Sequence, residues 1–352
     1  MQAKRGYFES EGVRYSYLTW CGSGKLNHGD KGFELSAAAS PAFAASSASE
    51  TAASRVDPAS PYAETSFDDE AFSASGTGIG TTPAPRLAEN AAARGEKPPV
   101  VLVHGFAQSA KSWGTVAEKL ASDRKVYAID LVGFGESYKS GNESAYSLQA
   151  MGRALVDFLR DRQCEQPLVV GYSLGGRVAL SALLEAGPAG FAACTSGLVL
   201  ESAGLGMASA ADRAAAATRD AATARRLREM PLADFMTYWE NLPLFDSQKR
   251  LPEEARNAVR AGRLANASEA LAISVERAGQ HAMPDRLRVL EALAELADTG
   301  TPVRYIAGQL DAKYSALAAE LPAGVETAIV PDAGHNIHLE RPDLFAALIN
   351  KA

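Results

Sequence analysis

The stretch Leu168-Val169-Val170-Gly171-Tyr172-Ser173-Leu174-Gly175-Gly176-Arg177 joins an apolar run to a serine that has glycines on both sides. The apolar run predicts a buried strand, and the apolar residues after the serine recur at helical spacing. Between a strand and a helix, Gly-x-Ser-x-Gly is typical of a nucleophile elbow, a turn so tight that small residues are needed beside the serine. The pattern alone also occurs by chance, as an ordinary turn with a serine cap. Its position between strand and helix favours the elbow, with Ser173 as the reactive residue.

The alternation of strands and helices continues on both sides of this elbow. Short apolar runs predict further strands at residues 99–103, 126–130, 198–201, 303–307 and 325–330, with helical periods between them. Such continuous runs are typical of strands that are covered on both faces, as in a parallel sheet. An alternating segment rich in aromatic residues at 13–20 predicts an early strand. We therefore expect an α/β protein with a mostly parallel, doubly wound sheet.

Two intervals depart from this alternation. Residues 27–97 are rich in Ala, Ser, Thr, Pro and Gly and poor in large apolar side chains, which predicts a disordered, low-complexity insertion. Residues 207–297 contain no convincing strand and read as several helices between two strands of the sheet. We expect them to form a helical lid above the sheet. The predicted core then comprises residues 1–26, 98–206 and 298–352.

Composition excludes several classes of partner. The 352 residues carry a net charge of −7, which argues against nucleic acid or an anionic membrane as the main partner. No apolar run is typical of a secretory signal or long enough to span a bilayer. The cysteines, Cys21, Cys164 and Cys194, are few and scattered, which favours reduced thiols in a cytoplasmic protein. No residue spacing suggests a metal site or a cofactor-binding loop, and the oligomeric state stays open.

Asp311 and His335 are the predicted partners of Ser173 in a catalytic triad. Asp311 follows the strand at 303–307, and His335 follows the strand at 325–330. The chain order Ser, Asp, His, with each residue after its own strand, is that of the α/β-hydrolase fold. In such a triad the imidazole takes the serine proton, and the carboxylate orients the ring and stabilises the imidazolium. The sequence therefore predicts an α/β-hydrolase fold with a helical lid.

Other residues could fill two of these roles. Asp332 or Glu201 could be the acid instead, and Asp311 could merely cap a helix. His338 and His104 compete with His335 for the role of the base. Asp311 is favoured because it lies at the carboxyl end of a strand, where loops converge on the site of an α/β sheet. His335 is favoured by the chain order.

The segment His104-Gly105-Phe106 directly follows a predicted strand. In this fold, the turn at that place offers a backbone N–H to the oxyanion hole, so Phe106 is one predicted donor. The N–H of Leu174, which follows the reactive serine, is the second. Each such donor contributes about 3 kcal/mol of transition-state stabilisation. His104 itself is predicted to be a structural hydrogen-bonding residue.

The elbow from Val170 to Ala179 resembles that of the 2-succinyl-6-hydroxy-2,4-cyclohexadiene-1-carboxylate synthase family, lyases of menaquinone (vitamin K2) biosynthesis. Further stretches agree with the same family, and the resemblance covers about residues 99–350. These stretches are Gly308 to Tyr314 around the acid, Ala333 to Glu340 around the histidine, Phe235 with Trp239 and Pro243-Leu244-Phe245 in the lid, and Arg263 to Asn266. The combination is much more specific than the elbow alone.

The resemblance implies a reaction and a set of substrate contacts. The family eliminates pyruvate from 2-succinyl-5-enolpyruvyl-6-hydroxy-3-cyclohexene-1-carboxylate, with the triad serine acting as a base and no cofactor. The substrate is a small polycarboxylate, which arginine forks bind well. The implied contacts are Arg177, Arg263, Trp239, Tyr172 and Arg213. For the arginines the alternative is a surface charge or a salt bridge, and for Trp239 it is packing within the lid.

The chain also departs from the family pattern. Early in the lid the family has two arginines three residues apart, whereas this chain keeps Arg213 and has Ala216 at the second position. Arg219 lies nearby and could substitute. Because a charge expected to hold a carboxylate is missing, other functions stay open. One is an esterase or carbon–carbon bond hydrolase in which Ser173 is a nucleophile or activates water, and another is a non-catalytic ligand-binding protein.

Overall fold

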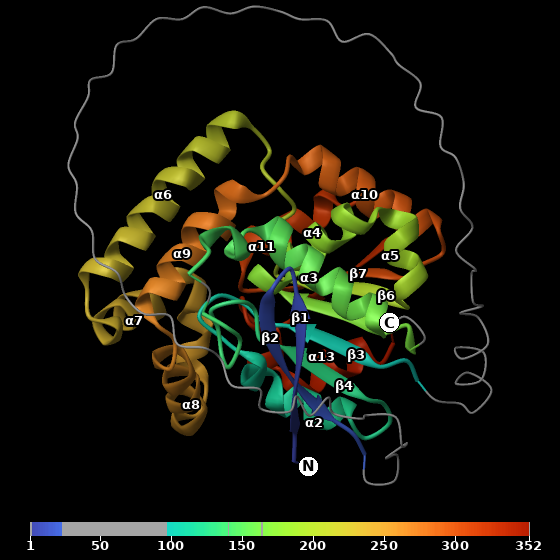
Figure 1. The fold of residues 1–352 in the computed structure, drawn as a ribbon, viewed down its shortest axis with the longest axis horizontal. Coiled ribbons are helices and arrows are strands. Elements are labelled where there is room, and N and C mark those ends of the chain that lie inside the picture. The colour runs from blue at the N-terminus through green and yellow to red at the C-terminus, as the bar shows by residue number, and fades with distance from the viewer. Residues whose placement is uncertain (1, 23–96, 140, 163–164, 352) are drawn as a thin grey trace, which may run out of the picture. The chain divides into compact units, whose positions relative to one another are not determined.

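The computed structural model describes residues 2–22, 97–139, 141–162 and 165–351. The predicted insertion at 27–97 lies outside the described residues apart from Lys97. Within the described part of the chain, eight strands form one sheet in the order β1-β2-β4-β3-β5-β6-β7-β8 (Figure 1). The strands are β1 (Lys4–Ser10), β2 (Val13–Trp20), β3 (Val100–Val103), β4 (Val126–Ile129), β5 (Leu168–Tyr172), β6 (Gly197–Glu201), β7 (Val303–Gly308) and β8 (Val325–Val330).

Most neighbouring strands of this sheet are parallel. Only the pairs β1–β2 and β2–β4 are antiparallel. All four residues of β3 are buried, with Val101 and Val103 in one apolar cluster and Val100 and Leu102 in another. This division follows from the pleat, which points successive side chains to opposite faces of the sheet. The predicted α/β-hydrolase fold with a mostly parallel sheet is thereby confirmed.

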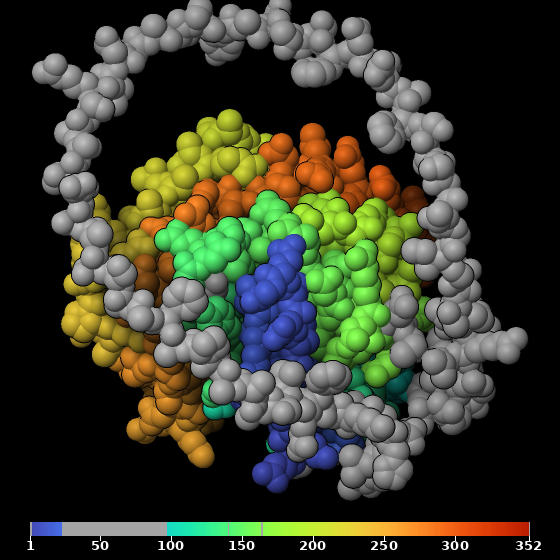
Figure 2. Space-filling model, in the orientation of Figure 1, coloured from blue at the N-terminus to red at the C-terminus, as the bar shows by residue number. Residues whose placement is uncertain are grey.

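Strand β1 was not predicted from the sequence. It lies at the edge of the sheet, and several of its side chains are exposed, so its apolar alternation is weak. The turn that joins β1 to β2 consists of Glu11 and Gly12, whose φ angles are 48° and 74°. Positive φ at both central residues is typical of a tight hairpin turn. Figure 2 shows this hairpin on the molecular surface, and β1 packs against α3 (Leu148–Asp161).

Helices cover both faces of the sheet (Figure 1). Helices α3, α4, α5 and α10 pack with one apolar cluster, and α2 and α13 pack with the other. Among the described residues, none of the helices has the length and apolar composition needed to cross a membrane. Apart from α3, the helices of the core are α2 (Gly114–Leu120), α4 (Leu174–Ala186), α5 (Pro188–Cys194), α10 (Arg286–Asp298), α11 (Ala312–Leu317), α12 (Ile337–Glu340) and α13 (Pro342–Ile349). The 3-10 helices of the core are η1 (Ala110–Trp113), η2 (Glu143–Tyr146) and η6 (Ala318–Glu320).

The chain between β6 and β7 is helical, and most of it stands apart from the sheet. A single parallel bridge between Met207 and Asp285 joins the two ends of this excursion. Helix α10 lies beyond the bridge and packs against α4, α5 and β7, so it belongs with the helices on the sheet. The excursion comprises α6 (Ala210–Glu229), α7 (Leu232–Glu240), η4 (Pro243–Arg250), α8 (Glu253–Leu264), α9 (Ser268–Ala278) and η5 (Gln280–Ala282).

Candidate active site

Ser173 lies at the turn between β5 and α4 in a strained backbone conformation. Its φ is 49°, which non-glycine residues rarely adopt. The N–H of Ser173 donates to the carbonyl oxygen of Glu201 at 2.9 Å, so the neighbouring strand β6 fixes the turn. Strain of this kind is maintained only where the surrounding structure enforces it, and it is typical of functional sites. The strand–turn–helix geometry is that of the predicted elbow.

Close backbone contacts explain the glycines around Ser173. A Cβ atom on Gly171 would lie 2.6 Å from the carbonyl oxygen of Gly175. One on Gly175 would lie only 2.0 Å from the carbonyl oxygen of Val103. Non-bonded carbon and oxygen atoms cannot approach so closely, so larger residues would push α4 away from β3 and change the position of the serine.

Ser173, His335 and Asp311 form a continuous hydrogen-bonded chain. His335 Nε2 lies 3.2 Å from Ser173 Oγ, and His335 Nδ1 lies 2.6 Å from Asp311 Oδ2. The other carboxylate oxygen of Asp311 accepts the N–H of Tyr314 and caps α11. Capping of a helix and pairing with His335 are therefore not alternatives for Asp311, since its carboxylate makes both contacts. Asp311 and His335 are both buried, which strengthens their interaction.

The other acids and histidines considered for the triad have different partners. Glu201 pairs with His338, with 2.7 Å between Oε2 and Nδ1. Asp332 is exposed on a turn at φ 54°. His104 is buried, donates through Nδ1 to the neighbouring carbonyl and accepts the N–H of Leu131 at Nε2. Burial lowers the pKa of His104, so this imidazole is a neutral structural group, in line with the sequence.

The predicted oxyanion-hole residues flank the reacting atoms. Phe106 and Leu174 both line the cavity that contains Ser173 and His335. Leu174 is the first residue of α4, so its N–H has no acceptor within the helix. Among the described residues, the N–H of Phe106 donates to no acceptor. Both N–H groups are therefore free to stabilise negative charge on a bound substrate, which is the role we propose for them.

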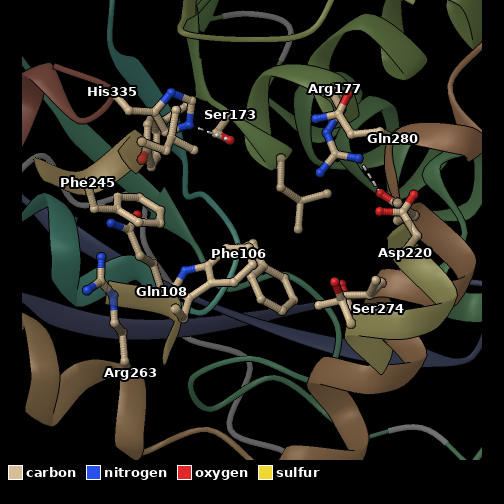
Figure 3. Close-up of a pocket in the computed structure, with 18 of the residues that line it drawn as sticks. Phe106, Gln108, Ser173, Arg177, Asp220, Phe245, Arg263, Ser274, Gln280 and His335 are labelled. Carbon is tan, nitrogen blue, oxygen red and sulfur yellow. Dashed lines mark hydrogen bonds between the residues drawn. The ribbon is translucent and has the colours of Figure 1, made fainter. Parts of the chain in front are cut away.

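The cavity above Ser173 is formed by core loops on one side and the helical excursion on the other (Figure 3). Trp239 from α7 lines it, with its ring centroid 5.2 Å from Phe106 and 5.7 Å from Phe245. Trp239 therefore contributes both to the packing of the helical excursion and to the cavity wall. Tyr172 is buried beside His335 at 5.4 Å between ring centroids. Burial raises the pKa of Tyr172, so its hydroxyl stays protonated.

Arg177 supplies a buried cation at one end of this cavity. Figure 3 shows it near Asp220 and Gln280, at the opposite end from Arg263. One nitrogen of Arg177 donates to the carbonyl of Ala278, whereas its Nε has no partner among the described residues. Arg177 makes no ion pair with the described residues, and burial lowers the pKa of its guanidinium. A buried guanidinium with spare donors is well suited to bind a carboxylate of a ligand.

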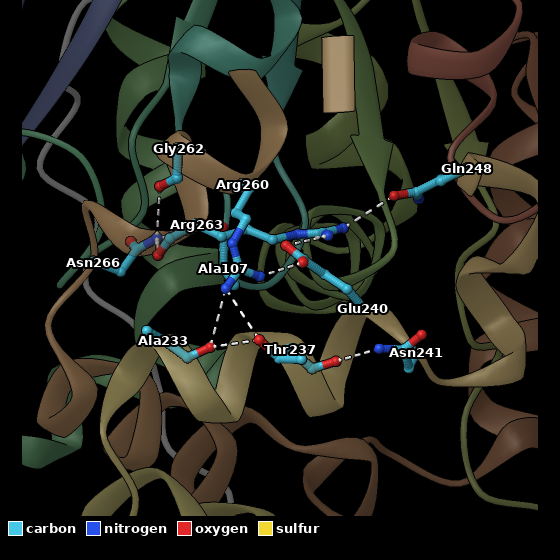
Figure 4. Close-up of polar contacts among 10 residues, drawn as sticks. All are labelled: Ala107, Ala233, Thr237, Glu240, Asn241, Gln248, Arg260, Gly262, Arg263 and Asn266. Carbon is cyan, nitrogen blue, oxygen red and sulfur yellow. Dashed lines mark hydrogen bonds and ion pairs between the residues drawn. The ribbon is translucent and has the colours of Figure 1, made fainter. Parts of the chain in front are cut away.

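Arg263 also lines the cavity, but it has protein partners. One guanidinium nitrogen lies 3.1 Å from Glu240 Oε1, and another donates to Gln248 Oε1 at 3.1 Å (Figure 4). Arg260 pairs with the other oxygen of Glu240 at 2.6 Å. Arg263 thus combines the two roles that the sequence left open, since it reaches the cavity and makes a salt bridge. Any carboxylate of a ligand at this end would share Arg263 with Glu240.

The structure does not bring Arg213 into the cavity. Its guanidinium donates to the carbonyls of His281 and Met283 and pairs with Asp285 at 2.6 Å. The expectation of a substrate contact therefore does not fit this residue, which instead ties α6 to the loop at the end of the excursion. Ala216 is buried, and Arg219 is exposed and does not line the cavity, so it does not replace the missing arginine.

Several polar residues that line the cavity were missed by the sequence analysis. They include Gln108, Asp220, Ser274 and Gln280. Gln108 follows Phe106 in the same loop, and this position could have drawn attention to it. The others come from helices of the excursion, and their contact with the cavity depends on how these helices pack. Among the described residues, no group of three His, Cys, Asp or Glu side chains is placed to hold a metal ion.

The sheet, the elbow and the hydrogen-bonded Ser173–His335–Asp311 chain define a protein of the α/β-hydrolase class. A sequence model described as the alpha/beta hydrolase family matches residues 100–348. The 2-succinyl-6-hydroxy-2,4-cyclohexadiene-1-carboxylate synthase of Citrobacter koseri is 36% identical over 250 residues, covering 70% of this chain and 89% of that protein. The enzyme of the same name from Enterobacter sp. is 31% identical and covers 72% and 90%.

A solved structure gives the same result. MenH from S. aureus has a TM-score of 0.66 and 28% sequence identity, covering 73% of this chain and 93% of that chain. The chain therefore belongs to the alpha/beta hydrolase family and, within it, to the family of the 2-succinyl-6-hydroxy-2,4-cyclohexadiene-1-carboxylate synthases.

Proposed function

We propose that this protein eliminates pyruvate from 2-succinyl-5-enolpyruvyl-6-hydroxy-3-cyclohexene-1-carboxylate, the reaction implied by its resemblance to the synthase family of its relatives. The observation that carries the proposal is the buried Arg177 in the same cavity as the Ser173–His335–Asp311 chain. A pocket for a neutral ester has no need of a buried cation, because desolvating the charge costs free energy that an anionic ligand offsets. A small polycarboxylate is the proposed substrate, and the cytoplasm is the proposed location, from the cysteine pattern.

In this reaction Ser173 acts as a base. Its Oγ removes the ring proton next to the succinyl ketone while His335 Nε2 takes the serine proton. Asp311 holds the imidazole with its proton on Nδ1 and stabilises the imidazolium. The electron pair moves onto the ketone oxygen, where the N–H groups of Phe106 and Leu174 stabilise the negative charge. Collapse of this enolate shifts the ring double bond and breaks the bond between the ring carbon and the ether oxygen. The released enolpyruvate takes up one proton, which balances the proton that His335 received, and becomes pyruvate.

The cavity supplies two cations for the carboxylates of the substrate. We assign one carboxylate to Arg177, whose donors are only partly used. Arg263 is the second candidate, although Glu240 already holds one of its nitrogens. Gln108, Ser274 and Gln280 add neutral donors to the lining, which also contains Asp220. With Ala216 on α6 in place of an arginine, these groups carry the recognition of the substrate.

The ring product tests this proposal against hydrolysis. An elimination gives pyruvate and a cyclohexadiene without the ether oxygen, whereas hydrolysis of the enol ether gives pyruvate and a cyclohexene with a second hydroxyl group in place of the ether. The two ring products differ in mass by one water. We expect the diene to be the sole enzymatic product when the substrate is generated in situ and the products are analysed by mass spectrometry. A ring with two hydroxyl groups, or fast cleavage of simple aryl esters with no diene, would move the assignment to a hydrolase.

A further inference from the structure

A second acid–histidine pair lies directly behind the catalytic centre. Glu201 is the last residue of β6, and both its carboxylate oxygens bind His338. One accepts the backbone N–H of His338 at 2.8 Å, and the other lies 2.7 Å from its Nδ1. Both side chains are almost completely buried, with exposures of 0% and 1%. Burying an acid and a histidine costs desolvation free energy unless their polar atoms are paired. A pair buried this deeply is therefore a candidate for a specific role.

Glu201 connects the two halves of the catalytic centre. Its backbone carbonyl accepts the N–H of Ser173 at 2.9 Å, and its side chain holds the segment that follows His335. Ser173 comes from the β5–α4 turn, whereas His335 comes from the loop after β8. The bond between His335 Nε2 and Ser173 Oγ therefore depends on how two separate loops are placed. A single residue that contacts both loops is well placed to fix that distance.

The ring of His338 is held on its other sides as well. It stacks on Trp113 with 3.8 Å between ring centroids, and it meets Tyr172 edge to face at 4.9 Å. Its Nε2 has no partner among the described residues. Nδ1 is therefore the ring nitrogen that donates to Glu201, since a proton on Nε2 would be a buried donor without an acceptor. Tyr172 also contacts His335, so the rings form one wall behind the triad.

We propose that Glu201 and His338 are positioning residues, which set the placement of His335 over Ser173 through the two hydrogen bonds between them. This inference rests on the proposed roles of Ser173 and His335. The length of the Glu201 side chain is then the decisive property, because only a full-length side chain reaches both N–H groups. Its charge matters less. A glutamine can accept the backbone N–H through its amide oxygen and donate from its amide nitrogen to Nδ1 of the tautomer of His338 that carries its proton on Nε2. This Nε2 proton has no acceptor among the described residues, which lowers stability but leaves both contacts in place.

The test compares Glu201→Asp with Glu201→Gln. The first keeps the charge and shortens the side chain, and the second keeps the length and removes the charge. The readouts are the second-order rate of phosphonylation of Ser173 by a fluorophosphonate, together with kcat and KM for pyruvate release. Leu159→Ala, a buried change on α3, is the control for lost stability alone. His338→Phe keeps the stacking on Trp113 and removes the Nδ1 donor, which gives a second way to break the contact.

We expect Glu201→Asp and His338→Phe to lower the phosphonylation rate and kcat by about 10- to 100-fold, because small misplacements of reacting groups have effects of this size. KM should change less than about twofold, and Glu201→Gln and Leu159→Ala should stay within about fivefold of the wild-type rates. The proposal is overturned if Glu201→Gln loses as much rate as Glu201→Asp, or if neither variant loses rate when folded. Wild-type protein that is phosphonylated but releases no pyruvate would contradict the proposed function and leave the phosphonylation comparison to decide this inference.

Discussion

Replacing Asp311 by asparagine is expected to lower kcat for pyruvate release by about 10⁴-fold with little change in KM. The carboxylate oxygen Oδ2 lies 2.6 Å from Nδ1 of His335 and accepts a hydrogen bond from its N–H. An amide nitrogen at that place is a donor, so the imidazole adopts the tautomer with its proton on Nε2. Nε2 then faces Ser173 Oγ without a free electron pair and cannot take the serine proton. The amide oxygen can still cap α11, so the fold is retained.

Asp332→Asn is the matched control for this prediction. Asp332 was the alternative acid in the sequence, and it is exposed on a turn at φ 54°, a conformation that asparagine also tolerates. We expect this variant to keep kcat within about twofold, as surface substitutions do. Steady-state pyruvate release by both variants is the measurement. A kcat for Asp311→Asn within tenfold of the wild type would show that the acid of the reaction lies elsewhere.

Replacing Arg177 by methionine is the second change with a large expected effect. The guanidinium is buried at one end of the cavity and makes no ion pair with the described residues. Removing it leaves a carboxylate of the bound substrate desolvated and unpaired. Losing one partner of a buried charge pair costs about 2–5 kcal/mol, which corresponds to a loss of about 30- to 5000-fold in kcat/KM. Methionine keeps most of the apolar volume, so the loss reports on charge rather than on packing.

Arg213→Met makes the same chemical change outside the cavity. Arg213 holds the carbonyls of His281 and Met283 and pairs with Asp285. We expect its loss to lower the melting temperature while kcat/KM of the folded protein stays within about threefold. Equal losses of kcat/KM in the two variants would mean that overall charge, and not the Arg177 site, attracts the substrate.

The arrangement of Ser173, His335 and Asp311 could be predicted because these residues are placed by local rules. The elbow requires glycines at defined offsets from Ser173, and Asp311 and His335 each follow a strand that its apolar run reveals. Parallel strands bring their carboxyl ends to one edge of the sheet, so the loops that follow them meet without further information. The same logic identified the positions of Phe106 and Leu174.

The lid was harder to predict because its contacts depend on how helices pack over long distances. The sequence cannot show that Glu240 would lie against Arg263, or that Arg213 would face the carbonyls of His281 and Met283. The helical pattern also predicted that the lid extends to residue 297. Helix α10 continues this pattern but packs on the sheet. Helical spacing reveals that a face is apolar, and it does not reveal which surface that face meets.

The most direct test of the account is the rate of pyruvate release from the enolpyruvyl substrate by the wild type and by Ser173→Ala, each compared with the spontaneous reaction. The account predicts release by the wild type far above the spontaneous rate and a loss of at least about 10³-fold in the variant, since the alanine has no hydroxyl to take the ring proton. Release at the same rate by Ser173→Ala would contradict the central role of the serine. Release at only the spontaneous rate by the wild type would contradict the proposed reaction.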